Sequence, residues 1–207
     1  MTINIKRDES IRRILDAAME VFASVGFAGA RIDEIARQAG VNKAMIYYRI
    51  GDKKTLYAEV LHDIFSNFVE RIEGKIEPHL PPEEKLRVYL RNLLSIFEAH
   101  PYIPRFMMWE LASGGGNFPE VAALDLARLL GLLKKILKEG VEKEIFLETN
   151  PFIPQMMAIG TMAFYRASKP IRTRYQMVDQ DLSNMDQAFS KDVAREIEEL
   201  VIKAVKR

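Results

Sequence analysis

The stretch GVNKAMIYYRIGDKK, residues 40–54, brings aromatic rings and positive charge together within a few helical turns. Before it, residues 31–38 show the apolar spacing of a short amphipathic helix, and a glycine-containing turn at residues 39–41 follows. Asn42 can cap a second helix over about residues 43–49. Two short helices joined by such a turn match a helix-turn-helix unit.

The second of these helices has two distinct faces. On a helical wheel Ile46 and Ile50 fall together and should face a core, whereas Ala44, Met45 and Tyr48 fall on the opposite side. A small residue lets the backbone approach a DNA duplex, and tyrosine hydroxyls and lysines reach phosphates. The pattern favours a helix that reads a major groove, although a solvated amphipathic face would show a similar composition.

Helical periodicity dominates the rest of the chain. An apolar stripe over residues 11–22 ends at Gly26, and a long helix should run from Lys53 to about Glu77, where Pro78 stops it. No segment alternates as a strand would, so the expected fold class is all-α with about nine helices. Further helices are expected at about 83–99, 102–113, 118–142, 151–168 and 187–206, with a polar connection from Pro170 to Asp186.

The charge distribution supports a division into two domains. The chain has 207 residues, of which 48% are apolar, so a sizeable core can form. A net charge of +1 excludes a globally basic nucleic-acid coat. Residues 1–54 nevertheless carry ten Lys and Arg against seven Asp and Glu. We expect one domain over residues 1–52, which contains the helix-turn-helix and whose excess of positive charge hints at an anionic partner, and a larger helical domain over residues 53–207.

Several functional classes lack their signatures. The chain has no cysteine, and His62, His79 and His100 are scattered, so neither a metal nor a cofactor is expected. No phosphate-binding loop or HExxH motif occurs, and the two Glu-x-x-His pairs that a carboxylate-rich metal bundle would need are absent. No run reaches the roughly 18 apolar residues of a membrane span, and the N-terminus lacks a signal-peptide core. These observations predict a cytoplasmic protein that is not an enzyme.

The ordered motifs of the N-terminal part resemble the DNA-binding domain of the TetR family of transcriptional regulators. The resemblance covers about residues 10–60, roughly a quarter of the chain. It rests on Ile14-Leu15-Asp16-Ala17-Ala18, Phe22, Gly26-Phe27, the run from Ile32 to Val41, Ile46-Tyr47-Tyr48 and Lys53-Lys54-Thr55-Leu56.

The resemblance implies a role for each residue of the motif. Ile46 and Val41 would hold the reading helix on its scaffold, and Asn42 would offer the helix start to DNA. Tyr47 and Lys53 would contact backbone phosphates. Lys43, Ala44, Met45 and Tyr48 would line the major groove.

Two positions depart from the family pattern. Ala30 stands where the family commonly has a threonine that caps the second helix and touches phosphate, and the neighbouring Arg31 would substitute through its charge. Ile50 replaces the usual phenylalanine and keeps an apolar side chain. DNA binding is therefore expected, with one phosphate contact altered.

The larger domain contains many aromatic and sulfur-bearing side chains. For any one of them a place in the hydrophobic core is the simpler explanation, yet such side chains also suit an apolar ligand. Arg105 could meet a polar or anionic group of such a ligand, although a surface ion pair is the favoured role. The resemblance implies a ligand pocket, for which we select Phe65, Phe68, Phe97, Tyr102, Phe106, Trp109 and Met162.

The last two expected helices carry stripes that permit close approach of helices. Packing within one subunit explains them equally well, whereas the resemblance implies a four-helix bundle across a two-fold axis. The candidate dimer residues are Met156, Ile159, Gly160, Ala163, Ile197, Leu200 and Val201.

The sequence therefore predicts a ligand-responsive transcriptional regulator, expected to be a repressor. It would bind a palindromic double-stranded operator as a homodimer and be released by a small, largely apolar effector. The alternative is an all-helical small-molecule-binding protein or enzyme whose N-terminal helices serve packing only.

Overall fold

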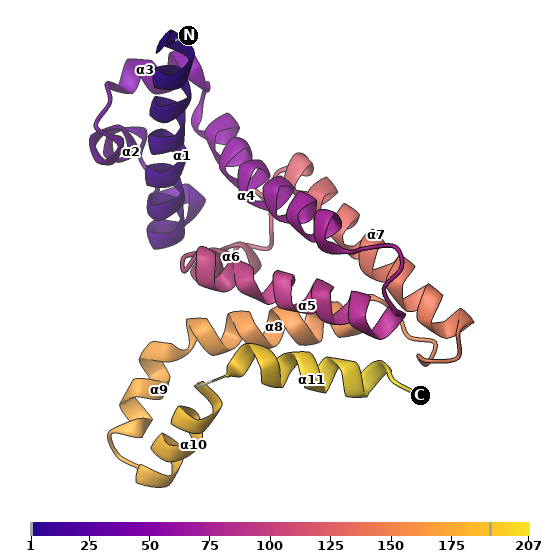
Figure 1. Ribbon diagram of the computed structural model, residues 1–207. Coiled ribbons are helices and arrows are strands. Elements are labelled where there is room, and N and C mark those ends of the chain that lie inside the picture. Colours follow the sequence, from indigo (N-terminus) through magenta and orange to yellow (C-terminus); the bar gives the residue numbers. More distant parts are fainter. Residues whose placement is uncertain (1, 191) are drawn as a thin grey trace. The chain divides into compact units, whose positions relative to one another are not determined.

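The computed structural model describes residues 2–190 and 192–207, and within them the predicted all-α class is confirmed (Figure 1). The described residues form eleven helices. They are α1 (Thr2–Gly29), α2 (Ile32–Ala39), α3 (Lys43–Arg49), α4 (Lys53–Lys75), α5 (Pro82–Ala99), α6 (Ile103–Ala112), α7 (Glu120–Glu142), α8 (Phe152–Ala167), α9 (Lys169–Gln176), α10 (Gln180–Ser190) and α11 (Val193–Val205).

The chain forms two compact units whose members do not follow chain order. The first unit comprises the residues up to Asn67 together with Arg105–Leu126, and the second comprises Phe68–Pro104 and Ala127–Arg207. The segment that contains most of α6 thus belongs to the same unit as the helix-turn-helix. The functional domain limits, residues 1–52 and 53–207, remain a prediction.

In the first unit α1 packs against α2, and α2 packs against α3. Ile14 and Phe22 of α1 and Ile35 of α2 are almost completely buried and form part of its core. Gly26 interrupts α1 as expected, because its φ of 71° lies in the left-handed region. Helical hydrogen bonding nevertheless resumes as far as Gly29.

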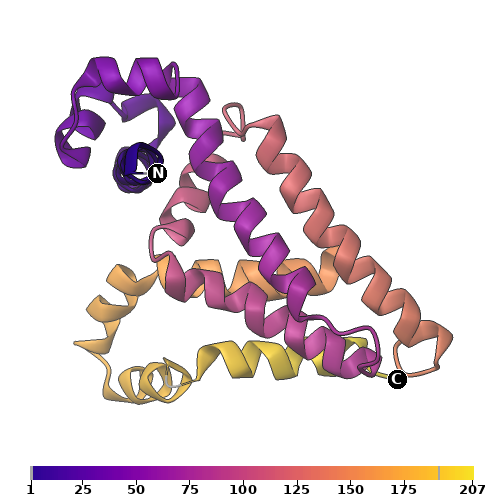
Figure 2. The ribbon, with the colours of Figure 1, turned by 45° about the horizontal axis from the view of Figure 1, so that its top comes forward.

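In the second unit α5, α8 and α11 pack against one another. Their side-by-side arrangement is visible in both ribbon views (Figures 1 and 2). Buried Tyr89 of α5 donates its hydroxyl to Gln155 Oε1 of α8 at 2.6 Å. Arg87 of α5 donates to both Glu198 and Glu199 of α11, at 3.0 and 2.7 Å. Apolar burial and an ion-pair network thus hold α11 to α5.

The prediction of about nine helices was too low, because the stretch from Pro170 to Asp186 is helical. It forms most of a hairpin made by α9 and α10, which links α8 to α11 (Figure 2). Pro170 lies in the first turn of α9, where the missing N–H breaks no helical hydrogen bond. Those side chains of the two helices whose burial the structure describes are mostly exposed, and they show no apolar stripe like that of the other helices.

The last predicted helix, residues 187–206, was also wrong in its start. Residues up to Ser190 belong to α10, Lys191 lies outside the described residues, and α11 begins at Val193. Helix α1 is longer than the predicted stripe over residues 11–22, since it begins at Thr2 and extends past Gly26 to Gly29. The remaining predicted helices agree with the structure to within about two residues at each end, which is the usual uncertainty of a helix boundary.

Two glycines of α7 give a matched test of the packing. A Cβ atom at Gly140 would overlap the Phe146 ring, whereas one at Gly131 would meet nothing within 4 Å. We expect Gly140→Ala to destabilise the chain by about 1–3 kcal/mol through overpacking. Gly131→Ala should stabilise it by about 0.5–1 kcal/mol, because alanine favours the helix. Urea unfolding followed by circular dichroism measures both changes, and equal unfolding midpoints would contradict this packing.

Candidate nucleic-acid interface and its supports

Helix α3 is held from one side only. Gly40 adopts φ 64° and ends α2, which turns the chain sharply. Asn42 then caps α3, since its Oδ1 accepts a hydrogen bond from the Ala44 amide at 2.9 Å. Ile46 is fully buried and is the one buried residue of this helix. The remaining side chains of α3 are therefore available to a partner.

The side chains of α3 that were predicted to meet DNA are exposed. Tyr48 is 81% exposed, Tyr47 is 49% exposed and Met45 is 36% exposed. Lys43 and Ala44 are exposed as well. Ile50, which was expected in the core beside Ile46, is only half-buried at the end of the helix. The structure thus leaves the predicted groove-facing residues of α3 exposed.

Lys43 has a partner that its local spacing did not reveal. Its Nζ lies 2.8 Å from Asp33 Oδ1 in α2, and both side chains are substantially exposed. The hydrogen bond to Asp33 raises the pKa of Lys43. The pair fixes the lysine at the edge of the α3 surface, and a DNA phosphate or base would have to compete with Asp33 for it.

Lys53 is likewise engaged within the chain. Its Nζ donates to the Ala28 carbonyl at 3.2 Å and lies 4.7 Å from the centre of the Phe27 ring. Burial lowers its pKa. Lys53 therefore joins the end of α1 to the start of α4, in addition to the phosphate contact predicted for it.

Helix α2 starts without a side-chain cap. Its N-cap residue is Arg31, which makes no side-chain capping bond, and Ala30 is buried. Asp33 and Glu34 lie in the first turn, where the helix dipole favours negative charge. Arg31 is exposed at this end of the helix. Its predicted contact with phosphate remains a prediction.

Helix α6 makes a joint with the end of α1 and the start of α4. A Cβ atom at Gly26 would lie 3.3 Å from Cδ2 of Trp109, so the indole ring covers this glycine closely. The Tyr57 hydroxyl donates a buried, short hydrogen bond to Glu110 Oε1. The Tyr57 ring also contacts Phe106, with ring centres 5.7 Å apart. The sequence analysis found neither the glycine contact nor the tyrosine–carboxyl pair.

The predicted pocket residues are distributed over both units. Five of the seven side chains are buried, while Tyr102 and Trp109 are 40% and 44% exposed. In the first unit Phe65 contacts Phe118, with ring centres 6.4 Å apart. Phe65, Phe106 and Trp109 belong to the first unit, and Phe68, Phe97, Tyr102 and Met162 belong to the second.

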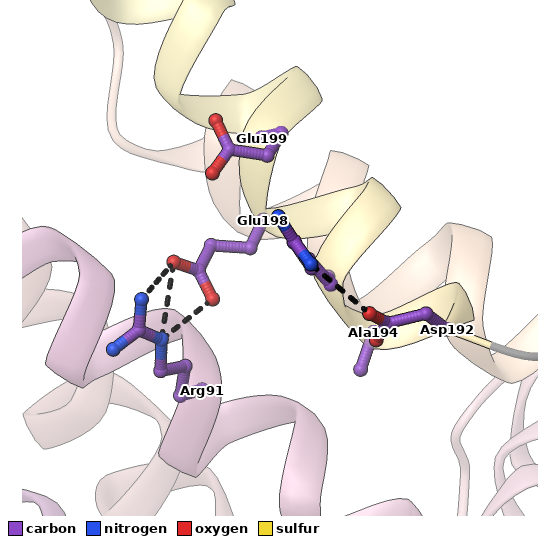
Figure 3. Close-up of a pocket in the computed structure, with 6 residues that line it drawn as sticks. Arg91, Asp192, Ala194, Glu198 and Glu199 are labelled. Carbon is purple, nitrogen blue, oxygen red and sulfur yellow. Dashed lines mark hydrogen bonds and ion pairs between the residues drawn. The ribbon is translucent and has the colours of Figure 1, made fainter.

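The second unit carries two surface hollows. One is charged, and Figure 3 shows Arg91 of α5 facing Glu198 of α11, with the Nε to Oε2 distance at 2.9 Å. The other is an apolar groove of about 550 Å³ between α8 and α9, and its lining includes Phe164 and Ile171. Neither hollow was predicted from the sequence.

The candidate dimer residues divide into buried and exposed sets. Ala163, Ile197 and Val201 are buried inside the second unit, whereas Met156 and Leu200 are 54% and 55% exposed. The exposed set also includes Gly160, and Ile159 is half-buried. Phe164, which the sequence analysis did not select, is 69% exposed one turn after Gly160.

Two searches of the described chain gave no site. None of its helices is both long and apolar enough to cross a membrane. Its acidic and histidine side chains form no group of three or more that could hold a metal ion.

Comparison with known proteins identifies relatives of the whole chain. Residues 14–60 match the family described as bacterial regulatory proteins, tetR family. The transcriptional repressor NicS of Pseudomonas putida is 28% identical over 177 residues, which is 83% of this chain and 82% of that protein. The solved structure of the regulator FadR from Bacillus subtilis with stearoyl-CoA superposes with a TM-score of 0.67 at 25% identity, covering 92% of this chain and 97% of that chain. A TetR family regulator from Marinobacter aquaeolei VT8 superposes with a TM-score of 0.75 at 16% identity, over 99% and 100% of the two chains, and shows the shared fold.

A comparison of Lys53 with Lys54 tests whether Lys53 stabilises the chain in addition to its predicted phosphate contact. Lys53→Ala should lower the free energy of unfolding by about 1 kcal/mol, since it removes the Ala28 hydrogen bond and the Phe27 cation–π contact. Lys54→Ala removes an equal charge from an exposed position and should leave stability unchanged. Denaturant unfolding at equal salt measures both free energies. Equal stability of the two variants would show that the contacts of Lys53 with Ala28 and Phe27 do not stabilise the chain.

Proposed function

We infer that this chain belongs to the tetR family of bacterial regulatory proteins and is a transcriptional regulator rather than an enzyme. On that premise we propose that it represses transcription by placing α3 in the major groove of an operator. The observation that carries the proposal is the asymmetry of α3, in which Ile46 is buried and the predicted reading residues are exposed.

The residues of this surface divide into two roles. Tyr47 and Lys53 contact phosphates and set the position of α3, and they carry no sequence information directly. Lys43, Ala44, Met45 and Tyr48 face the bases, where they provide hydrogen bonds and apolar contacts. Arg31 adds a phosphate contact at the start of α2, and Asn42 sets the start of α3 through its cap.

A homodimer would present two such helices to a palindromic operator. Met156, Gly160 and Phe164 follow one another at four-residue spacing on α8, and all three are exposed. A contiguous apolar surface of this kind is typical of a protein interface. We propose that it packs against the same surface of a second copy, with Leu200 of α11 beside it, whereas Ala163, Ile197 and Val201 support it from within.

A small effector would regulate this repressor. The FadR relative was solved with stearoyl-CoA, and the candidate pocket residues of this chain are aromatic or sulfur-bearing. We propose a largely apolar effector that favours a conformation in which α3 is misplaced for the operator. A coupling of about 1–3 kcal/mol would weaken operator affinity about 5- to 150-fold. Since its target is chromosomal DNA, the chain is expected to act in the cytoplasm.

Operator binding tests the proposal directly. Fragments of the source genome, including the region upstream of its own gene, would be screened by gel shift at about 50 and 200 mM salt. We expect one or a few fragments to bind with a Kd of about 10⁻⁸–10⁻¹¹ M and a steep loss of affinity at the higher salt. Retention of no fragment at either salt concentration would refute the function.

Variants of α3 then test the roles. Tyr47→Phe should weaken binding across sequences, whereas Lys43→Ala and Tyr48→Ala should change which bases are preferred. Lys138→Ala serves as the control, because Lys138 is an exposed lysine of α7 in the second unit. If all three α3 variants bound operator like the unaltered chain and like the control, α3 would not be part of the interface.

The proposed dimer has its own test. Phe164→Asp places a charge on the exposed α8 surface and should convert the dimer into a monomer, which sedimentation velocity resolves. Leu124→Asp makes the same exchange at a leucine of α7 that is 63% exposed, and it should remain dimeric. A dimer in both variants would place the interface elsewhere.

A further inference from the structure

Glu110 of α6 is buried, and only one of its two carboxyl oxygens is hydrogen-bonded. The residue is 8% exposed and lies in the first unit, between the half-exposed Trp109 and the exposed Leu111. Its Oε1 accepts the hydrogen bond from the Tyr57 hydroxyl. Its Oε2 is buried and has no hydrogen-bond partner. Buried polar atoms of native proteins are almost always paired, so this oxygen needs an explanation.

The Tyr57 hydroxyl cannot donate a further hydrogen bond to Glu110 Oε2. Tyr57 is 1% exposed, and burial together with the hydrogen bond to Glu110 raises the pKa of its hydroxyl, so it stays protonated. A phenol has a single O–H donor, and Glu110 Oε1 already accepts it. Oε2 therefore remains an acceptor that only a further donor group can satisfy.

The surroundings of Glu110 are apolar and adaptable. Buried Phe106 precedes Glu110 by one helical turn on the same face of α6, and half-buried Met107 precedes Glu110 by three residues, which also makes it a neighbour on the helix surface. The rings of Phe106 and Tyr57 contact each other. Thioether and aromatic side chains suit a ring-containing ligand, and a single acid among them selects for a complementary polar group.

We propose that Glu110 is the residue that recognises the effector, and that the effector is an amphipathic amine with an apolar, ring-containing body and an N–H donor for Oε2. This inference rests on the proposed effector-controlled function and names the chemistry of its ligand. Water can occupy the position in the ligand-free chain, and a group that displaces it must bring a donor of its own. An anionic head group would instead meet the carboxylate oxygen and be disfavoured.

The same carboxyl group connects the ligand to the DNA-binding unit. The ligand would bind one oxygen while Tyr57 of α4 binds the other, and Trp109 beside it covers Gly26 at the end of α1. A shift of α6 that improves the ligand's hydrogen bond therefore acts on α4 and on α1, and α1 packs against α2, which packs against α3.

Three probes that differ only in head group test the inference. Phenylbutylamine, phenylbutanol and phenylbutanoate would be titrated against the full-length chain while the fluorescence of Trp109, the single tryptophan, is followed. We expect the amine to bind more tightly than the alcohol, and the alcohol more tightly than the carboxylate. Glu110→Gln should weaken the binding of the amine by about 10- to 100-fold, because a charge-assisted hydrogen bond is lost. The affinity for the alcohol should change much less.

Matched variants separate recognition from folding. Glu110→Gln keeps an oxygen that can accept the hydrogen bond from Tyr57, so this support of α6 is retained. Glu59→Gln removes a carboxylate from an exposed position of α4, and this control should keep the preference for the amine.

The outcomes are decisive in both directions. Loss of the amine preference in Glu110→Gln alone supports the inference. Binding of no probe, equal binding of the three probes, or tighter binding of phenylbutanoate overturns it. Operator gel shifts without any probe report on the proposed function separately, so a failure of ligand recognition is distinguishable from a failure of DNA binding.

Discussion

A seven-residue helix cannot maintain itself in water, where isolated helices shorter than about 12–15 residues are marginal. Helix α3 therefore depends on the burial of Ile46, which gives it one anchor in the core of the first unit. The Asn42 cap and the left-handed Gly40 fix where the helix starts and how it leaves α2. All three supports act from the inner side or from the helix start. The outer face takes no part in these three supports, and its exposed Tyr48 and Met45 are available for recognition.

Local patterns were sufficient to predict this arrangement. Apolar spacing identified α2 and the buried Ile46, and the cap and glycine signals located the turn between the helices. The same reasoning failed for α9 and α10, because helices with mostly exposed side chains show no stripe. Periodicity also says which face is buried but not what it packs against. The Lys53 contact spans 25 residues and the Tyr57–Glu110 bond spans 53, so neither could be read from spacing.

The grouping of α6 with the N-terminal helices has a specific physical origin. Gly26 has no side chain, so the Trp109 indole can lie directly on the backbone where α1 is interrupted. Tyr57 then adds a hydrogen bond that excludes other orientations of α6, because a buried carboxyl group that lost it would have no partner at either oxygen. Shape at Gly26 and polarity at Glu110 together make this joint specific. A displacement of α6 would therefore act directly on α1 and α4, which it contacts at Gly26 and Tyr57.

Two lysines of the proposed DNA-binding surface already make contacts within the free chain. Lys43 is paired with Asp33, and Lys53 is bound to the end of α1. When such a lysine meets a phosphate it exchanges one favourable contact for another, so the gain is the difference between the two. For Lys43 the exchange also leaves Asp33 close to a negatively charged duplex, which lowers the gain further. In the proposed interface, affinity for an arbitrary duplex is thereby reduced, and a larger share of the binding free energy must come from Tyr48, Met45 and the other residues proposed to face the bases. A surface of this kind gains selectivity by making its phosphate contacts less favourable.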